Sequence, residues 1–519
     1  MTAVSTNISF ADSLSEFAFS FYDEVDKSGN VCLSPFSVSA TLLLLMMGTN
    51  GSSKTQLRSA LFKKAIPPCD LNHRYKTLQR DLISKAHDIP EMQLSIVNRF
   101  GVARQQVHRL RYNFRRDARN NYRCYVSLMD FGREPYTRKR INKWIERRTG
   151  RKIKNMIPDG LLNKFTFMVL TNVIYFKGQW KSKFDAKLTR DRDFWVNNTT
   201  KTSVSMMYQK STVMVTDDNE LNCKVVELPY KGDSFSMIVI LPNEIDGLSS
   251  LEQRLTFKKF NRLINKLYKF ETEIVLPKFN ITSNIDLKTI LPNLGVSDIF
   301  NPTMADFSHM VRPDDQYRDL YVSDAIHQAV VVVSEEGSEA TAATHFVISF
   351  RSASPPTFKF TADHPFLFFI RDISSGTILF LGRFVNPSMK YIDHYRIPIM
   401  PPQDILPLDD PTNQPFVNKT VNSDPLKEPK KPSVDVTSIA INKTADFTNE
   451  HQIILSRQNG DLENDPEESY KISQDEANNV LNPPLSSNGN ENPVSVIVEN
   501  GVSPVTDLSD KSETDTKPT

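Results

Sequence analysis

Residues 329–352 read AVVVVSEEGSEATAATHFVISFRS. The four valines Val330–Val333 predict the interior of a central β-strand, because β-branched residues favour strands. From Gly337 there follows a run of eight small or polar residues without proline. The stretch ends at an Arg351–Ser352 bond, which a trypsin-like protease would cut. A segment able to join a β-sheet, coupled to a cleavage site, indicates a protein that is cut and then changes its fold.

The residues after Gly337 alternate in character, as the two faces of a strand do. One set is small or apolar and uncharged: Ser338, Ala340, Ala342, Thr344, Phe346, Ile348 and Phe350. The other set holds the only acid and the only histidine: Glu339, Thr341, Ala343, His345, Val347 and Ser349. A shift by one residue would bury Glu339, so this pattern favours a single register. Insertion of this segment into a β-sheet as a new strand would add about a dozen backbone hydrogen bonds at roughly 1 kcal/mol each. These bonds favour insertion strongly.

Composition divides the chain into two parts. The 519 residues carry a formal net charge of +2. Residues 401–519 hold 21 acidic against 9 basic residues and a single tyrosine, so they have too few apolar and aromatic side chains to offset the entropy of ordering. We therefore expect a globular, basic domain over residues 1–390 and an acidic, low-complexity, disordered tail over residues 391–519.

Localisation is predicted from the N-terminus and the cysteines. Asp12, Glu16 and Asp23 interrupt the first apolar residues, which predicts an amphipathic helix rather than a signal peptide. Four scattered cysteines in so long a chain predict buried thiols rather than a disulfide scaffold. No apolar run reaches the length of a bilayer. We expect a cytoplasmic protein without a membrane span, with leaderless export to the extracellular space as the alternative.

Helices are predicted mainly in the first part of the chain and strands in the second. Helical spacing of apolar residues predicts helices over residues 107–121 and 137–149. Later, nearly continuous apolar or β-branched runs predict strands, including residues 168–176 and one long strand over Phe270–Ile281. This order favours an α+β fold over a doubly wound α/β fold.

A basic tract covers residues 99–154, with 18 Lys/Arg and 4 Asp/Glu. Arg111, Arg115 and Arg119 lie four residues apart and would share one helix face. They are candidates for binding a heparin-like polyanion. The alternative is a solvated basic face that balances the acidic tail. We find no pattern that indicates nucleic-acid binding, a metal site, a cofactor or a catalytic centre.

Six motifs in order resemble those of the serpins, the superfamily of serine protease inhibitors. The likeness runs from about Phe10 to Pro387. They are NVCLSPFS (30–37), LTNVIYFKGQW (170–180), LPKF (276–279), AIHQA (325–329), DHPFLF (363–368) and GRFVNP (382–387). The resemblance implies three β-sheets, about nine helices, and an exposed reactive loop that enters the central sheet after cleavage. It also implies a monomeric inhibitor that is consumed in one reaction and is not an enzyme.

The resemblance also assigns site residues. In inhibitory serpins the residue attacked by the protease typically lies 14 after the hinge glycine, which gives Arg351. The expected partner is then a trypsin-like serine protease, trapped as a covalent acyl complex. Cleavage after Phe350, by a chymotrypsin-like protease, is the alternative register. The implied hinge comprises Glu335, Gly337, Ser338, Glu339, Ala340, Thr341, Ala342, Ala343 and Thr344.

Further residues resemble the polar positions of the sheet that opens. Ser34, Ser37, Asn172 and His327 correspond to a cluster beneath the opening, whereas Trp180, Lys278 and Glu335 correspond to its top. The alternative for His327 is that it has no role in the opening of the sheet and is a hydrogen-bonded histidine of the core. The first rival function is that of a non-inhibitory serpin acting as a chaperone, carrier or storage protein, and the second is that of a polyanion-binding protein.

Overall fold

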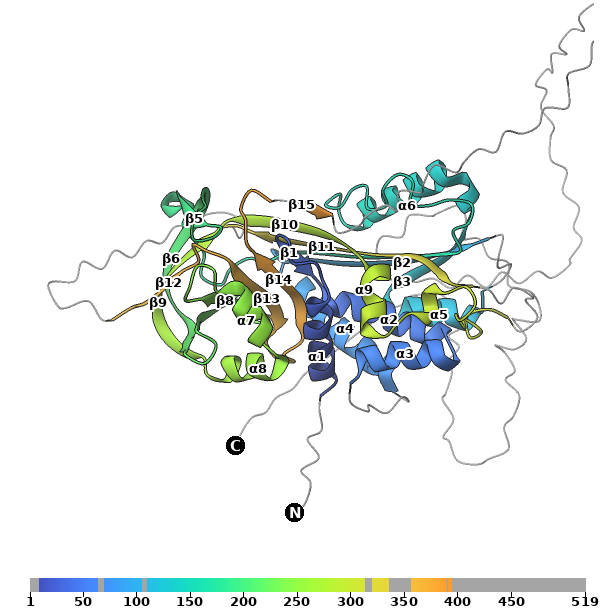
Figure 1. Ribbon diagram of the computed structural model, residues 1–519, viewed down its shortest axis with the longest axis horizontal. Helices are drawn as coiled ribbons and strands as arrows, with labels where there is room; N and C mark the ends of the chain where they lie inside the picture. Colours follow the sequence, from blue (N-terminus) through green and yellow to red (C-terminus); the bar gives the residue numbers. More distant parts are fainter. Residues whose placement is uncertain are drawn as a thin grey trace, which may run out of the picture. The chain divides into compact units, whose positions relative to one another are not determined.

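The computed structural model describes residues 9–63, 70–104, 110–312, 320–335 and 356–389, and the backbone of residues 391–393. The chain separates into two compact units, residues 1–408 and residues 409–519. All of the described residues belong to the first unit (Figure 1).

Nine α-helices lie within the described residues. They are α1 (Phe10–Asp23), α2 (Pro35–Gly48), α3 (Gly51–Leu61), α4 (Leu71–His87), α5 (Tyr112–Tyr122), α6 (Glu134–Arg148), α7 (Leu248–Arg254), α8 (Phe257–Asn265) and α9 (Leu287–Ile290). Helix α2 begins directly after Ser34, whose side chain accepts the N–H of Ser37, and Pro35 occupies the first turn.

Fifteen strands are described, in two hydrogen-bonded sheets. Those of the first 230 residues are β1 (Val31–Leu33), β2 (Gln93–Ala103), β3 (Cys124–Met129), β4 (Met168–Lys177), β5 (Arg190–Trp195), β6 (Lys201–Asp218) and β7 (Cys223–Pro229). The later ones are β8 (Phe235–Pro242), β9 (Tyr268–Pro277), β10 (Phe279–Asp286), β11 (Val322–Val333), β12 (Phe358–Thr361), β13 (Phe366–Asp372), β14 (Ile378–Phe384) and β15 (Tyr391–Asp393).

The six-stranded sheet has the order β15-β10-β11-β4-β2-β3. Strands β4 and β11 are direct neighbours and run parallel, from the Met168–Val322 pair to the Lys177–Val332 pair. Nine of the ten residues of β4 are buried, which explains its nearly continuous apolar sequence.

The nine-stranded sheet combines two of the three expected sheets. Strand β6 pairs with β5 and β9 along most of its length and with β7 at its end, so one long strand joins the two parts. The predicted single strand over Phe270–Ile281 is wrong, because the chain breaks between Pro277 and Phe279. It continues as β10 in the other sheet, and the Lys278 N–H at the break donates to the Ser205 carbonyl.

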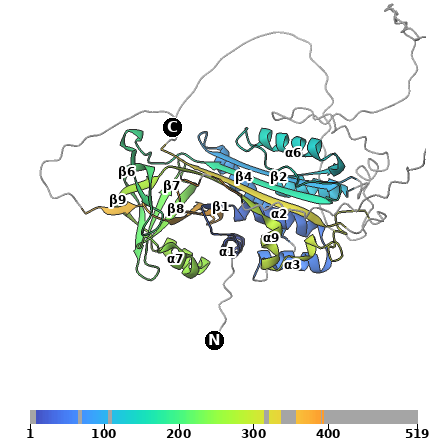
Figure 2. The same ribbon diagram turned by 45° about the horizontal axis from the view of Figure 1, so that its top comes forward.

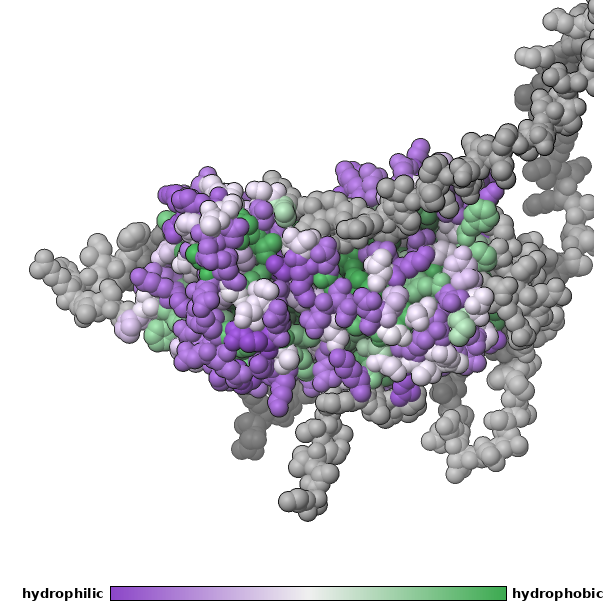
Figure 3. Space-filling view, viewed as in Figure 1, coloured by the Kyte–Doolittle hydropathy of each residue, from purple (hydrophilic) through white to green (hydrophobic). Residues whose placement is uncertain are grey.

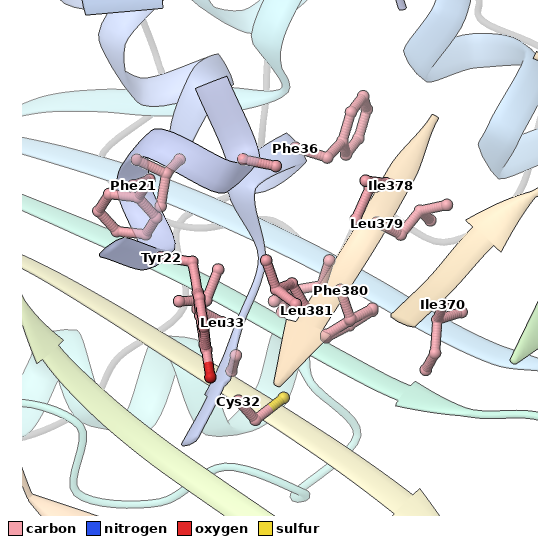
Figure 4. Packing of buried hydrophobic residues seen from close by; sticks show 14 of the residues in the cluster. Phe21, Tyr22, Cys32, Leu33, Phe36, Ile370, Ile378, Leu379, Phe380 and Leu381 are labelled. Atoms are coloured by element: carbon pink, nitrogen blue, oxygen red, sulfur yellow. The ribbon is translucent and has the colours of Figure 1, made fainter. Parts of the chain in front are cut away.

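The main core lies between the two sheets and the helices α1 and α2. Figure 4 shows part of it, in which Phe21 of α1, Leu33 of β1 and Phe36 of α2 lie in the same apolar cluster as Leu379 and Leu381 of β14. All five residues are at most 1% exposed. This packing covers the inner face of the six-stranded sheet.

Helix α6 covers the opposite face of the same sheet (Figures 1 and 2). A separate apolar cluster forms there, in which Ile141 and Ile145 of α6 accompany Val173 of β4 and Ile326 and Val330 of β11. The cluster therefore includes residues of α6 and residues on both sides of the β4–β11 boundary. The face of the molecule shown in Figure 3 is mixed, with hydrophilic residues interspersed with hydrophobic ones.

The helix predicted over residues 107–121 begins later than expected, at Tyr112. Leu110 instead pairs with Val311 as an isolated bridge, and the Arg111 N–H donates to the Met310 carbonyl. Tertiary pairing thus outweighs the helical spacing of the apolar residues before Tyr112. The helix predicted over residues 137–149 is confirmed as α6.

Three of the four cysteines are described: Cys32, Cys124 and Cys223 are free and buried. Cys69 lies outside the described residues. Among the residues that the structure covers, no helix combines the length and the apolar character needed to cross a membrane.

Candidate functional site: a sheet seam and its anchor

The candidate site centres on the boundary between β4 and β11, which we call the seam. His327 of β11 and Asn172 of β4 are register partners across it, and both are fully buried. The Nδ1–H of His327 donates to Asn172 Oδ1 at 2.6 Å, because the other ring nitrogen, Nε2, accepts the Ser34 N–H at 2.9 Å. A neutral imidazole with this tautomer satisfies both partners.

The Asn172 amide continues this network to α2. Its Nδ2 donates to the Ser37 Oγ at 2.8 Å and to the Ser37 carbonyl at 2.9 Å. The structure thus brings together Ser34, Ser37, Asn172 and His327, the four residues grouped from the sequence. Since buried polar groups need partners, separation of β4 from β11 requires this set to exchange hydrogen bonds.

Three further residues extend the network, and sequence reasoning missed them. Asn172 Nδ2 also donates to Asn98 Oδ1 of β2 at 2.5 Å, and Asn98 Nδ2 donates to the Tyr122 carbonyl at 3.0 Å. The Tyr122 hydroxyl donates to Asn72 of α4. A polar residue on the inward face of β2, between Ile96 and Phe100, was the available signal, but strand β2 itself was not predicted.

Acid is expected to destabilise the seam through His327. Burial lowers the pKa of His327 from 6.5 to about 3. The unfolded chain therefore binds this proton more tightly, so the associated stability is complete above pH 6.5 and is lost as the pH falls toward 3. Near pH 5 the loss should be about 2 kcal/mol.

This expectation is checked by urea unfolding of the wild type and of His327→Gln near pH 7.5 and near pH 5. The wild type should lose about 2 kcal/mol more than the variant, because all other titrating groups are shared. Equal losses in the two proteins would contradict the assignment.

A second group of residues, which we call the anchor, lies at the end of β11, directly after Val333. The Lys278 ammonium lies 2.8 Å from one Glu335 carboxylate oxygen, and the Thr189 hydroxyl donates to the other at 2.9 Å. Burial alone would raise the pKa of Glu335, but the bonds from Lys278, its own backbone and Thr189 outweigh it, so the pKa is lowered. The carboxylate is thus held charged although it is 8% exposed.

Trp180 completes the anchor. Its indole N–H donates to the Ser334 carbonyl at 2.9 Å, and its ring stacks on Tyr230 at 4.6 Å between centroids. Gly178 permits this arrangement, since a Cβ there would lie 2.6 Å from the Tyr230 ring. The structure therefore places Trp180, Lys278 and Glu335 together, although they come from three distant segments.

Lys278→Met is expected to weaken the anchor. The variant leaves the Glu335 carboxylate with Thr189 but without its cation, at a cost of about 1 kcal/mol because Lys278 is half exposed. The intact protein should then convert several-fold faster, on mild heating, to a form with the loop inserted. Glu335→Gln keeps an acceptor for Thr189 and is the matched control, with a smaller acceleration. Conversion is followed by the rise in thermal stability that an added central strand would give; a wild-type rate for Lys278→Met would contradict the assignment.

The hinge residues after Glu335 and the Arg351–Ser352 bond lie outside the described residues. The described chain resumes at residue 356, and β12 then pairs parallel to β9. The two ends of the predicted loop are thus held in different sheets, by β11 and by β12.

The three arginines proposed for polyanion binding differ in their surroundings. Arg111 Nε donates to the Val311 carbonyl at 2.5 Å and one of its terminal nitrogens to the Ser308 carbonyl at 3.2 Å. Arg115 is half-buried and Arg119 is exposed, and both have interaction partners. Arg111 therefore ties α5 to the segment near Val311. Within the described ranges, no group of three His, Cys, Asp or Glu residues could hold a metal ion.

Comparison with known proteins identifies the family. Residues 12–387 match the family model described as serpin (serine protease inhibitor), so the chain belongs to the serpin family. It is 37% identical over 377 residues to the leukocyte elastase inhibitor of Equus caballus, covering 71% of this chain and 96% of that protein.

Solved structures agree with this fold. A highly specific serpin of the insect Tenebrio molitor aligns with a TM-score of 0.64 and 31% identity, over 74% of this chain and 99% of the other. Human thyroxine-binding globulin in complex with its ligand gives a TM-score of 0.64 and 28% identity, over 73% and 98%.

Proposed function

We propose that this serpin inhibits trypsin-like serine proteases as a single-use substrate, through the Arg351–Ser352 bond. The observation that carries the proposal is the closed seam, in which β4 and β11 pair directly and β11 leads into the anchored start of the loop. After the protease forms an acyl intermediate, the freed segment enters the seam and carries the protease with it. Deacylation then fails, because displacement distorts the protease's catalytic groups.

The strand directions support such an insertion. A segment that turns back at the end of β11 runs antiparallel to β11 and, since β4 is parallel to β11, antiparallel to β4 as well. One parallel pairing is thus replaced by two antiparallel ones, which are slightly more stable per residue. The uncharged set that begins at Ser338 suits the inner face of the sheet, where the main core lies.

Specificity follows from the residue before the cut bond. A trypsin-like pocket contains a carboxylate that pairs with the Arg351 guanidinium. The similarity to inhibitors named for elastase favours a different target, because an elastase pocket is small. Neither Arg351 nor Phe350 suits a small pocket, so we retain the trypsin-like assignment.

The test is a denaturing gel after incubation with trypsin, chymotrypsin or elastase. We expect a covalent complex with trypsin. Mass spectrometry should show that the fragment of this chain bound to trypsin ends at Arg351. Cleavage without any complex would exclude inhibition by this mechanism. A complex only with chymotrypsin, cut after Phe350, would retain inhibition but replace the target class.

The rival function is that of a non-inhibitory carrier, as the thyroxine-binding globulin's name describes for that protein. A carrier needs no insertion, so its loop tolerates bulky or charged hinge residues. Here the hinge from Ser338 to Thr344 has one charge, at Glu339, on the outward set. This composition favours the inhibitor.

A second candidate function is the binding of a heparin-like polyanion, for which Arg111, Arg115 and Arg119 were the sequence candidates. The exposed cations Lys139, Lys143 and Arg147 favour it more, because they repeat every four residues along the outer face of α6. Retention on heparin that falls with salt is expected, and a Lys139→Gln/Lys143→Gln/Arg147→Gln variant should elute earlier. Low-salt elution of a form that ends at residue 390 would exclude this function.

A further inference from the structure

The end of the seam opposite the anchor carries three aromatic residues. Phe167 directly precedes β4, and Tyr321 directly precedes β11. Their ring centres lie 4.8 Å apart, so this pair joins the two sides of the seam at its end. The Phe167 N–H also donates to the Ser323 hydroxyl of β11 at 2.9 Å. The third residue is Phe165, and we call Phe165, Phe167 and Tyr321 the end group.

Phe165 differs from the other two because a hydrogen-bonded turn presents it to solvent. The Asn163 N–H donates to the Thr166 hydroxyl at 3.0 Å, and the Thr166 N–H donates back to the Asn163 carbonyl at 3.0 Å. Asn163 Oδ1 accepts the Phe165 N–H at 2.8 Å. Phe167 and Tyr321 are half-buried, whereas Phe165 is 65% exposed. An aromatic side chain on a fixed backbone loses little conformational entropy on contact, which suits it to anchor a protein interface.

The proposed insertion brings the cut end of the loop to the end group. The uncharged set begins at Ser338 and would face the main core, as Val333 at the end of β11 does. A direct turn after β11 therefore places Ser338 beside Val333, and the inserted strand then runs antiparallel to β11. Arg351 follows Ser338 by 13 residues, so it comes close to the level of Leu320, just beyond the last pair of β4 with β11. A protease bound to Arg351 would thus lie beside the end group.

We propose that Phe165 packs against the trapped protease and holds it in the displaced position. Insertion draws the protease, joined by an ester to the Arg351 carbonyl, against the end group. Burial of the exposed Phe165 ring stabilises this state over one in which the protease's catalytic groups reassemble. Reassembled groups would let water attack the ester, which leaves a carboxylate on Arg351 and frees the protease's serine hydroxyl.

Phe165 is therefore a positioning residue that acts on the lifetime of the complex. It does not act on complex formation, because the protease reaches the end group only after the acyl bond has formed and the loop has inserted. The inference rests on the proposed function, since it assumes that the loop enters the seam and carries the protease with it.

The test follows the decay of the covalent complex between the full chain and trypsin. The complex is separated from free protein, and the return of trypsin activity is measured over time with a chromogenic substrate. We expect Phe165→Ser to release active trypsin about tenfold faster than the wild type, an effect of the size found for aromatic interface residues. Phe165→Tyr should stay within about twofold of the wild-type rate, because it keeps the ring.

Tyr268→Ser is the matched control. Tyr268 begins β9 in the nine-stranded sheet, which does not contain the seam, and it is 48% exposed. Its release rate should stay within about twofold of the wild type. All three variants should form the complex at nearly the wild-type rate and unfold at nearly the wild-type temperature, because exposed side chains contribute little to the stability of the free protein. A merely structural role of Phe165 would instead lower the melting temperature of the free protein.

The outcomes separate the inference from the function on which it rests. A wild-type release rate in Phe165→Ser, or equal acceleration by Tyr268→Ser, would overturn the role of Phe165 alone. Slower complex formation with an unchanged release rate would assign Phe165 to the first encounter and would also overturn it. If the wild type formed no covalent complex, the proposed inhibition itself would fail, and the inference with it.

Discussion

Trypsin should cleave an Ala342→Asp variant without being trapped. Ala342 belongs to the uncharged set, which in the proposed insertion faces the main core, so an unpaired carboxylate there would have to be buried. Such burial costs several kcal/mol, enough to make insertion slower than hydrolysis of the acyl intermediate. We expect the yield of covalent complex to fall at least about 100-fold, with a corresponding gain of cleaved inhibitor.

Ala343→Asp is the matched control for this prediction. Its side chain belongs to the set that already contains Glu339, so the added charge faces away from the main core. The gel should show nearly the wild-type amount of complex. If both variants behave alike, the alternation that we infer for the inserted strand is wrong.

Replacing Arg351 with alanine is expected to have the largest effect on specificity. Loss of the guanidinium leaves the carboxylate of a trypsin-like pocket unpaired, so the second-order rate constant for trypsin inhibition should fall by about 1000-fold or more. Phe350→Ala should change that rate by less than about tenfold. The reverse pattern, measured with chymotrypsin, would place the cut after Phe350.

The sequence predicted the seam and its anchor because both rest on residues whose chemistry is unusual for their surroundings. His327 and Asn172 are polar residues inside apolar strands, and Trp180 follows a buried strand directly. The sequence grouped Lys278 with Trp180 and Glu335, although it predicted one continuous strand over residues 270–281. The break at Lys278 depends on a change of sheet, which the β-branched pattern of residues 270–281 does not encode.

Other features depend on partners distant in the sequence. Asn98 became recognisable only when β2 was placed beside β4, and its partner is the backbone carbonyl of Tyr122. Arg111 appeared to be one of three equivalent arginines on a helix face, yet it precedes α5 and binds carbonyls near residue 310. The spacing of residues in the sequence predicts which side chains share a helix face. It does not predict which of those side chains form hydrogen bonds within the folded chain.

Strand β15 bears on self-association. It pairs with residues Thr282–Asn284 of β10, just beyond the boundary at residue 390 that composition suggested for the folded domain. An uncovered edge strand offers its backbone groups to any extended chain, including one from a second copy. In the proposed mechanism the sheet accepts a strand at the seam, so pairing of its edge with another chain would compete with inhibition. By occupying part of β10, the chain beyond residue 390 reduces the edge at which fibrous growth could begin.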